Sequence, residues 1–171
     1  MKLLLAVAPE RFRDEELEVP KRAFEEAGIG IDIASTVAGT CTGMLGARTE
    51  AAMTFDEVDP GDYVGIVVVG GAGSADHLWG SRRLQELVRT FFEEGRVVAA
   101  ICLAPVVLAR AGILAGRQAT VYPAPAAVAE MKRAKAVLHD IPVVADMQIV
   151  TANGPAAAAQ FADTVITKLE C

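Results

Sequence analysis

Aromatic residues are scarce in this sequence of 171 residues, at 5%, whereas hydrophobic residues make up 53%. A core with few large rings has to be built from Ala, Val, Leu and Ile, as is usual for buried parallel sheets. Long apolar runs are also missing, and none approaches the roughly 18 residues that a membrane-spanning helix needs. The apolar opening, residues 1–9, is too short for a signal sequence and runs at once into Glu10 and Arg11. We therefore expect a soluble, cytoplasmic protein.

Cysteine and positive charge are limited as well. The three cysteines, Cys41, Cys102 and Cys171, form no CxxC pair and no spacing typical of a metal site, so we expect free thiols and no metal. A formal net charge of −6 argues against nucleic acid and anionic membranes as main partners. The glycine-rich stretch 70–77 lacks the Lys-Ser/Thr of a nucleotide-binding P-loop, and no other motif predicts a cofactor. Small molecules and other proteins remain as partners.

Apolar runs and amphipathic stretches alternate along the chain, with short turns and no linker. This alternation predicts one domain, 1–171, with an α/β fold: a three-layer α/β/α sandwich with a mostly parallel, doubly wound, flavodoxin-like sheet. We expect strands at 3–7, 29–35, 63–69, 96–101 and 117–122, a hairpin or edge excursion at 37–54, and a pair of strands around Ile141-Pro142 within 136–151. We expect helices at 14–28, 82–94, 103–111, 123–135 and 156–169.

The stretch 95–112 organises these elements around one cysteine. An apolar strand, 96–101, runs into Cys102 and directly on into a helix whose first turn contains Pro105, where a missing N–H costs little. A nucleophile on such an elbow points out of the sheet, lies near the positive end of the helix, and has backbone N–H groups nearby for a developing oxyanion. Cys102 is therefore a candidate nucleophile. A small buried core residue is the plain alternative, since free cysteine is often buried.

Several stretches together resemble the DJ-1/PfpI (ThiJ/PfpI) superfamily, within the class I glutamine amidotransferase-like fold. AAICLAPVVLA at 99–109 resembles its nucleophile elbow, and VVGG at 68–71 its strand and glycine pair. FRDEELEVP at 12–20, TVYP at 120–123 and VTANGP at 150–155 resemble further blocks, so that the resemblance covers nearly the whole chain. It implies the sandwich fold described above, a reactive cysteine at position 102, and association into a homodimer or a higher homo-oligomer.

The resemblance also assigns partners to Cys102. Glu16 matches the carboxyl group that family members place against the cysteine sulfur, where a protonated acid would donate a hydrogen bond to the thiolate. Gly71 and Leu103 match the positions whose backbone N–H groups form the family's oxyanion pocket. Taken by itself, Glu16 is also explained as one of four acids in an ordinary acidic helix start, Asp14, Glu15, Glu16 and Glu18.

The chain departs from the peptidase-type members of the family at the position after the cysteine. Those members carry His there, whereas this chain has Leu103, which cannot accept a proton. Their carboxylate from the glycine loop falls here on Ala75 or Asp76, and the His that some members carry after the elbow helix falls on Tyr122. Tyrosine donates hydrogen bonds but is a poor base near neutrality.

Two further polar side chains are weaker site candidates. His77, in the glycine loop, could approach the cysteine, although a polar loop histidine is more often a surface or capping residue. Arg48, on the expected hairpin, could hold an anionic group.

The pattern favours a cysteine-dependent enzyme of the glyoxalase or deglycase type, in which the Cys102 thiolate attacks a reactive carbonyl or an early glycation adduct and Glu16 shuttles protons. The alternative is an oxidative-stress sensor or holdase chaperone whose cysteine is oxidised to a sulfenic or sulfinic acid. An intracellular peptidase or amidase is the least expected of the three, because the adjacent His is missing.

Overall fold

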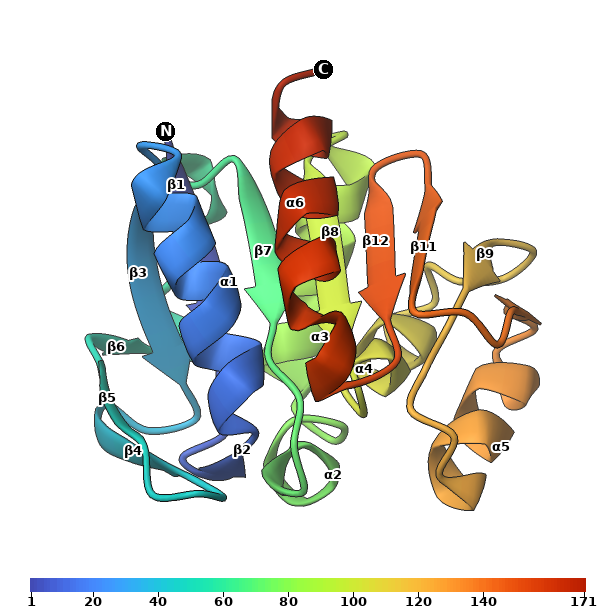
Figure 1. Ribbon diagram of the computed structural model, residues 1–171, viewed down its shortest axis with the longest axis horizontal. Helices are drawn as coiled ribbons and strands as arrows, with labels where there is room; N and C mark the ends of the chain where they lie inside the picture. Colours follow the sequence, from blue (N-terminus) through green and yellow to red (C-terminus); the bar gives the residue numbers. More distant parts are fainter.

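A seven-stranded sheet runs through the middle of the computed structural model, which describes residues 1–171 (Figure 1). The strand order is β11-β12-β8-β7-β1-β3-β6, and every neighbouring pair is parallel except β11 and β12. The strands are β1 (Lys2–Ala6), β3 (Gly30–Ser35), β6 (Met53–Thr54), β7 (Gly65–Val68), β8 (Val97–Ile101), β11 (Val143–Asp146) and β12 (Ile149–Ala152). The most apolar run of the sequence thus forms the central strand, β7.

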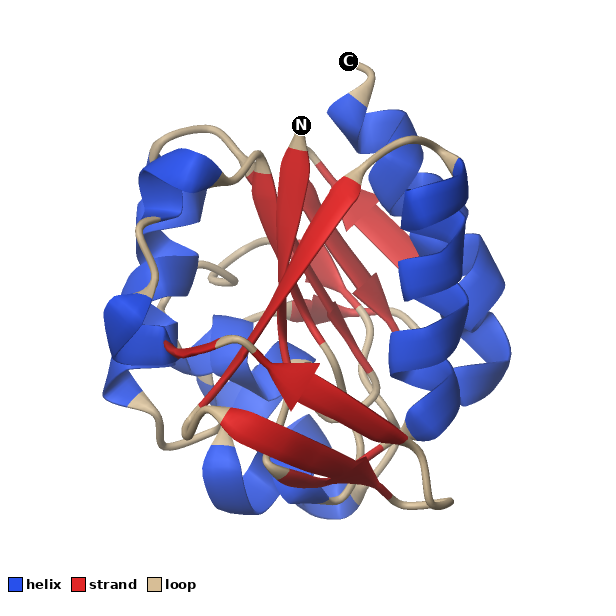
Figure 2. Ribbon diagram, turned by 90° about the vertical axis from the view of Figure 1, so that its left-hand side faces the viewer, coloured by secondary structure: helices blue, strands red, loops and turns tan.

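Helices cover both faces of this sheet, as Figure 2 shows in side view. One face carries α1 (Asp14–Glu26) and α6 (Ala158–Leu169), which lie side by side in Figure 1. The other carries α3 (Arg82–Glu93), α4 (Pro105–Arg110) and α5 (Pro125–Arg133).

Two buried clusters fill the space between the layers. Leu3 and Leu5 of β1 point toward α1 and α6, whereas Leu4 and Ala6 point toward α3 and α4. This period of two is what a strand buried on both faces requires. The predicted three-layer, mostly parallel α/β fold is confirmed.

A second, three-stranded sheet lies beyond the carboxyl end of β1. The hairpin expected at 37–54 is present as β4 (Gly39–Gly43) and β5 (Arg48–Ala51), and β4 also pairs with β2 (Glu10–Phe12), a short strand that the sequence analysis missed. Asp14, at the start of α1, is buried and accepts hydrogen bonds from the N–H groups of Leu45 (3.0 Å) and Ala47 (2.9 Å). The tip of the hairpin is therefore fixed against the first turn of α1.

Two predictions about the second half of the chain were wrong in detail. The strand expected at 117–122 is reduced to β9 (Gln118–Ala119), which pairs with β10 (Val137–Leu138) outside the main sheet. The next N–H groups bond elsewhere: that of Thr120 donates to the Thr151 hydroxyl and that of Tyr122 to the Cys102 carbonyl. The two strands expected around Ile141-Pro142 are present as β10 before it and β11 after it, but they do not pair with each other, because β10 pairs with β9 and β11 pairs with β12 in the main sheet.

Short helical segments complete the chain. The glycine loop contains one turn of helix, α2 (Gly73–His77), which the sequence analysis did not predict. The 3₁₀ segments are η1 (Phe55–Glu57), η2 (Pro60–Asp62) and η3 (Pro155–Ala157). None of the helices combines the length and the apolar character that crossing a bilayer requires.

Candidate active site

Cys102 occupies the sharp turn that the sequence predicts between strand β8 and helix α4. Its backbone has φ 65°, in the left-handed region that residues other than glycine rarely adopt. Two hydrogen bonds hold this conformation: the Cys102 N–H donates to the Ala152 carbonyl (2.8 Å), and the Cys102 carbonyl accepts from the Tyr122 N–H (2.9 Å). The chain therefore turns abruptly at the cysteine, and Pro105 begins α4 three residues later.

The glycine pair after β7 lets the start of α1 approach this turn. Gly71 has φ 115°, and a Cβ there would overlap the backbone of Arg13. A Cβ on Gly70 would overlap Glu16 Oε1 and would lie 2.7 Å from the Cys102 Cβ. The Gly70 carbonyl accepts a hydrogen bond from the Arg13 N–H (2.9 Å), which fixes the approach. Position 70 must therefore lack a side chain if Glu16 and Cys102 are to meet.

Glu16 is a fully buried carboxyl group beside the cysteine. Its side chain is 0% exposed, and neither carboxyl oxygen has a hydrogen-bond partner with good geometry. Burial raises the pKa of Glu16 from its ordinary value of 4.5 to about 8, against smaller lowering effects from the Cys102 side chain and the positive charge of Arg13. Glu16 is therefore protonated at neutral pH, as an acid that donates a hydrogen bond has to be.

Opposing effects act on the thiol. Burial raises the pKa of Cys102, and an ionised Glu16, through its charge and by accepting a hydrogen bond from the thiol, would raise it further, to about 12. The backbone N–H groups of Gly71 and Leu103 lower it. Neither of these N–H groups donates to a backbone carbonyl, so both are free to bind a negative charge at this point. The elbow position favours the thiolate, whereas burial, the largest effect in the structure, opposes it.

The two groups titrate as a pair because each changes the charge that the other experiences. A charged Glu16 repels a thiolate, but a protonated Glu16 exerts no such repulsion and can donate its proton in a hydrogen bond to the sulfur. The thiolate consequently forms most readily while Glu16 keeps its proton. One negative charge, on the sulfur and facing the two N–H groups, is the arrangement that this geometry favours.

The buried acid gives a testable pH dependence of stability. A carboxyl group whose pKa is about 8 when folded and about 4.5 when unfolded stabilises the fold fully below pH 4.5, and this contribution is lost as the pH rises through 8. Glu16→Gln stays neutral over this range. Between pH 5 and 8.5 the Tm of the wild type should therefore fall by roughly 5–15 °C more than the Tm of Glu16→Gln. Thermal unfolding across this range is the measurement. The exposed Glu18→Gln is the control and should follow the wild type; equal slopes for all three proteins would contradict a buried, protonated Glu16.

A cavity of about 280 Å³ opens above the cysteine. Eight residues line it: Arg13, Met44, Gly71, Ala72, Cys102, Leu103, Tyr122 and Pro155. The structure thus brings Cys102, Gly71, Leu103 and Tyr122 together, with Glu16 buried behind Cys102. Arg13 and Met44 were missed by the sequence analysis. Arg13 could have been found, because it stands three residues before Glu16, one turn away at the start of the same helix.

The other predicted site residues do not line the cavity. His77 lies 3.1 Å from Glu10 Oε1, and Asp76 forms an ion pair with Arg11, so that both residues tie α2 to β2. Arg48 is exposed on β5, away from the cysteine. No histidine lines the cavity, and the second histidine of the chain, His139, hydrogen-bonds to Gln118.

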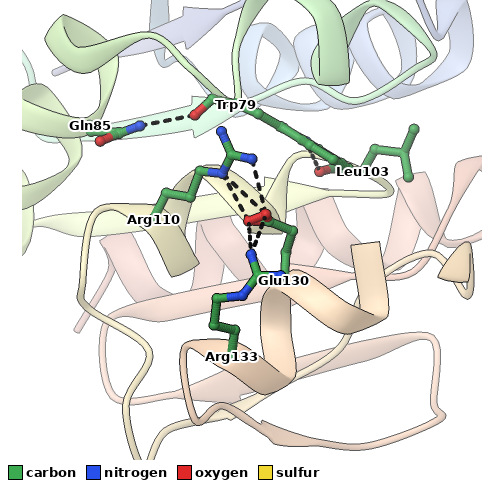
Figure 3. Close-up of polar contacts among 6 residues, drawn as sticks. All are labelled: Trp79, Gln85, Leu103, Arg110, Glu130 and Arg133. Carbon is green, nitrogen blue, oxygen red and sulfur yellow. Dashed lines mark hydrogen bonds and ion pairs between the residues drawn. The ribbon is translucent and has the colours of Figure 1, made fainter. Parts of the chain in front are cut away.

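A tryptophan side chain holds the residue that follows the nucleophile, Leu103. Trp79 Nε1 donates to the Leu103 carbonyl (2.8 Å), and the Trp79 carbonyl accepts from Gln85 Nε2 (2.9 Å) (Figure 3). The Arg110 guanidinium lies 5.6 Å from the centre of the indole ring and is paired with Glu130. Because the Leu103 carbonyl is held, the orientation of the neighbouring peptide groups at the elbow is constrained.

The chain resembles known proteins along nearly its whole length. The chain matches the DJ-1/PfpI family over residues 1–168. It is 49% identical to an uncharacterized protein of Methanocaldococcus jannaschii over 99% of this chain and 82% of that protein. It is 37% identical to a deglycase of Pyrococcus horikoshii over 72% of this chain and 73% of the relative.

Among solved structures, a ThiJ/PfpI domain protein of Brachyspira murdochii superimposes with a TM-score of 0.93 at 34% identity, over 99% of this chain and 96% of that one. The sequence resemblance, the fold and the elbow cysteine with its buried acid all point the same way. The chain belongs to the DJ-1/PfpI family.

Proposed function

We propose that this protein is a cysteine-dependent enzyme that acts on small reactive carbonyl compounds, with glyoxalase or deglycase chemistry. One observation carries the proposal: a buried carboxyl group, protonated at neutral pH and without another hydrogen-bond partner, borders the only cysteine that lines the cavity. The name of the Pyrococcus horikoshii relative, a deglycase, supports the same chemistry.

The first step is attack of the Cys102 thiolate on the aldehyde carbon of a 2-oxoaldehyde. A carbon–sulfur bond forms, the carbonyl π bond breaks, and its electron pair moves to the oxygen. The Gly71 and Leu103 N–H groups stabilise that oxygen, and Glu16 donates its proton to give a neutral hemithioacetal.

Glu16, now a carboxylate, can accept a proton in the second step. It removes the proton from the former aldehyde carbon, which gives an enediol, and returns this proton to the neighbouring carbon. The hydroxyl proton of the hemithioacetal moves at the same time to the former ketone oxygen, so that the aldehyde carbon is oxidised to a thioester and the ketone is reduced to an alcohol. Water then hydrolyses the thioester to a 2-hydroxy acid and restores the thiol. The net reaction adds one water molecule and needs neither a redox cofactor nor a histidine.

Peptide hydrolysis is less well supported by this cavity. The amine that leaves an amide must be protonated, a task for which cysteine peptidases use a histidine next to the thiol. Leu103 follows the cysteine, His77 bonds to Glu10, and no histidine lines the cavity.

Residues 1–171 would act as one domain, in the cytoplasm, as a homodimer or a higher homo-oligomer. These parts of the proposal rest on the family resemblance.

Turnover of methylglyoxal tests the proposed function directly. We expect loss of methylglyoxal and equimolar formation of lactate, continuing well beyond one equivalent per Cys102. Methylglyoxal consumption that stops at one equivalent would contradict the enzyme hypothesis and favour the sensor hypothesis, in which each thiol reacts only once. Release of amine from aminoacyl amides at enzymatic rates, without carbonyl turnover, would favour the peptidase reading.

A further inference from the structure

Arg13 is the only charged side chain that lines the cavity above Cys102. The other lining residues are apolar or uncharged, so that this guanidinium dominates the electrostatics that a ligand meets there. Its positive charge interacts with both Glu16 and Cys102. The protein as a whole carries a net charge of −6, which makes a local positive charge in the cavity the exception.

The position of Arg13 is fixed by the chain on both sides. Its N–H donates to the Gly70 carbonyl (2.9 Å), and its carbonyl accepts from the Glu16 N–H (3.0 Å). The side chain is paired with Glu15, from Nε to Oε2 at 2.6 Å and from Nη2 to Oε1 at 3.3 Å. Nη1 has no hydrogen-bond partner. Glu15 does not line the cavity, so it restrains the guanidinium and leaves part of its hydrogen-bonding capacity for a ligand.

We propose that the cavity selects carbonyl compounds that also carry a carboxylate, and that Arg13 binds this carboxylate while Cys102 reaches the carbonyl carbon. A guanidinium matches the planar geometry of a carboxylate, and hydrogen bonds between charged groups are stronger than neutral ones. A cation is needed here for a second reason, because an anionic ligand would otherwise be repelled by the thiolate. The substrates under this proposal are anionic 2-oxoaldehydes. Their turnover rests on the proposed function.

Alkylation of Cys102 tests the selectivity without requiring turnover. Iodoacetate and iodoacetamide attack the same thiolate, with formation of a carbon–sulfur bond and loss of iodide, and differ in charge. The ratio of their rates is therefore insensitive to a change in the thiol pKa. In Arg13→Gln the iodoacetate to iodoacetamide ratio at Cys102, followed by peptide mass spectrometry, should fall by about tenfold.

Glu15→Gln is the matched variant, because it removes the charge that competes for Arg13 and should raise the same ratio. A ratio within twofold of the wild type in Arg13→Gln, or a ratio that falls in Glu15→Gln, would overturn the proposal. High salt should reduce the difference between the wild type and Arg13→Gln.

Turnover separates this inference from the proposed function. We expect 4,5-dioxopentanoate, an anionic 2-oxoaldehyde, to be preferred over its uncharged methyl ester in kcat/KM, and Arg13→Gln to remove most of this preference. Turnover of both compounds with no preference would overturn the proposed selectivity for carboxylates and leave the proposed function intact. An alkylation ratio that depends on Arg13, without turnover of either compound, would support the carboxylate site and contradict the proposed function.

Discussion

Cys102→Ser should lose methylglyoxal turnover by about a thousandfold or more, because a serine hydroxyl has no base beside it to activate it. Leu103 supplies none, and Glu16 is protonated at neutral pH. The replacement keeps the size of the side chain and the left-handed backbone, so the fold should persist. Lactate formation and circular dichroism, measured on the same samples, separate loss of chemistry from loss of structure.

Cys171→Ser is the control for the Cys102 variant. Cys171 is exposed at the end of the chain and lies far from the elbow, at the opposite end of the strands. Its replacement should leave turnover unchanged. If Cys102→Ser retained substantial turnover while Cys171→Ser lost it, the assignment of the nucleophile would be wrong.

Removal of the buried acid should have the second large effect. With Glu16 protonated, Glu16→Ala deletes a hydrogen bond of roughly 1.5–3 kcal/mol to the thiolate, so the pKa of the Cys102 thiol should rise by about one to two units. Glu16→Gln keeps an amide donor and should raise the pKa less, yet both variants should lose turnover because neither can shuttle a proton. The measurement is the rate of Cys102 alkylation against pH, together with lactate formation.

The sign of this shift is decisive. If Glu16 were charged in the resting protein, its removal would abolish a repulsion and the thiol pKa would fall instead. A fall in Glu16→Ala would therefore contradict the protonated acid. Glu18→Gln, an exposed acid on the same helix, should leave the thiol pKa and the turnover unchanged.

The elbow could be predicted from the sequence because its signals are local. An apolar strand, a cysteine and Pro105 follow one another within ten residues, and each has a preferred place in a strand–turn–helix unit. The strand order of the sheet and the fate of 117–122 depend on pairing between distant segments, which periodicity does not report. β9 leaves the main sheet because β12 already occupies the position beside β8.

The buried acid was harder to identify. Four acids lie at the start of α1, and composition alone does not say which of them is buried; the family resemblance singled out Glu16, and the space left by Gly70 gives the physical reason. Asp14 is buried as well, but it is occupied by the hairpin tip. His77 could not be placed from the sequence, because loop polarity does not give the direction of a side chain; in the structure it lies beside Glu10 and does not line the cavity.

The left-handed backbone at Cys102 has a consequence for the evolution of this fold. A residue with a Cβ in this conformation costs roughly 1–2 kcal/mol, and the rest of the protein has to supply that stability. Glycine is the residue that this backbone conformation tolerates best, and glycine would remove the nucleophile. A β-branched residue would be strained further at this position. Selection for thermal robustness alone would therefore act against the cysteine, and its presence implies that selection for its chemistry outweighs that pressure.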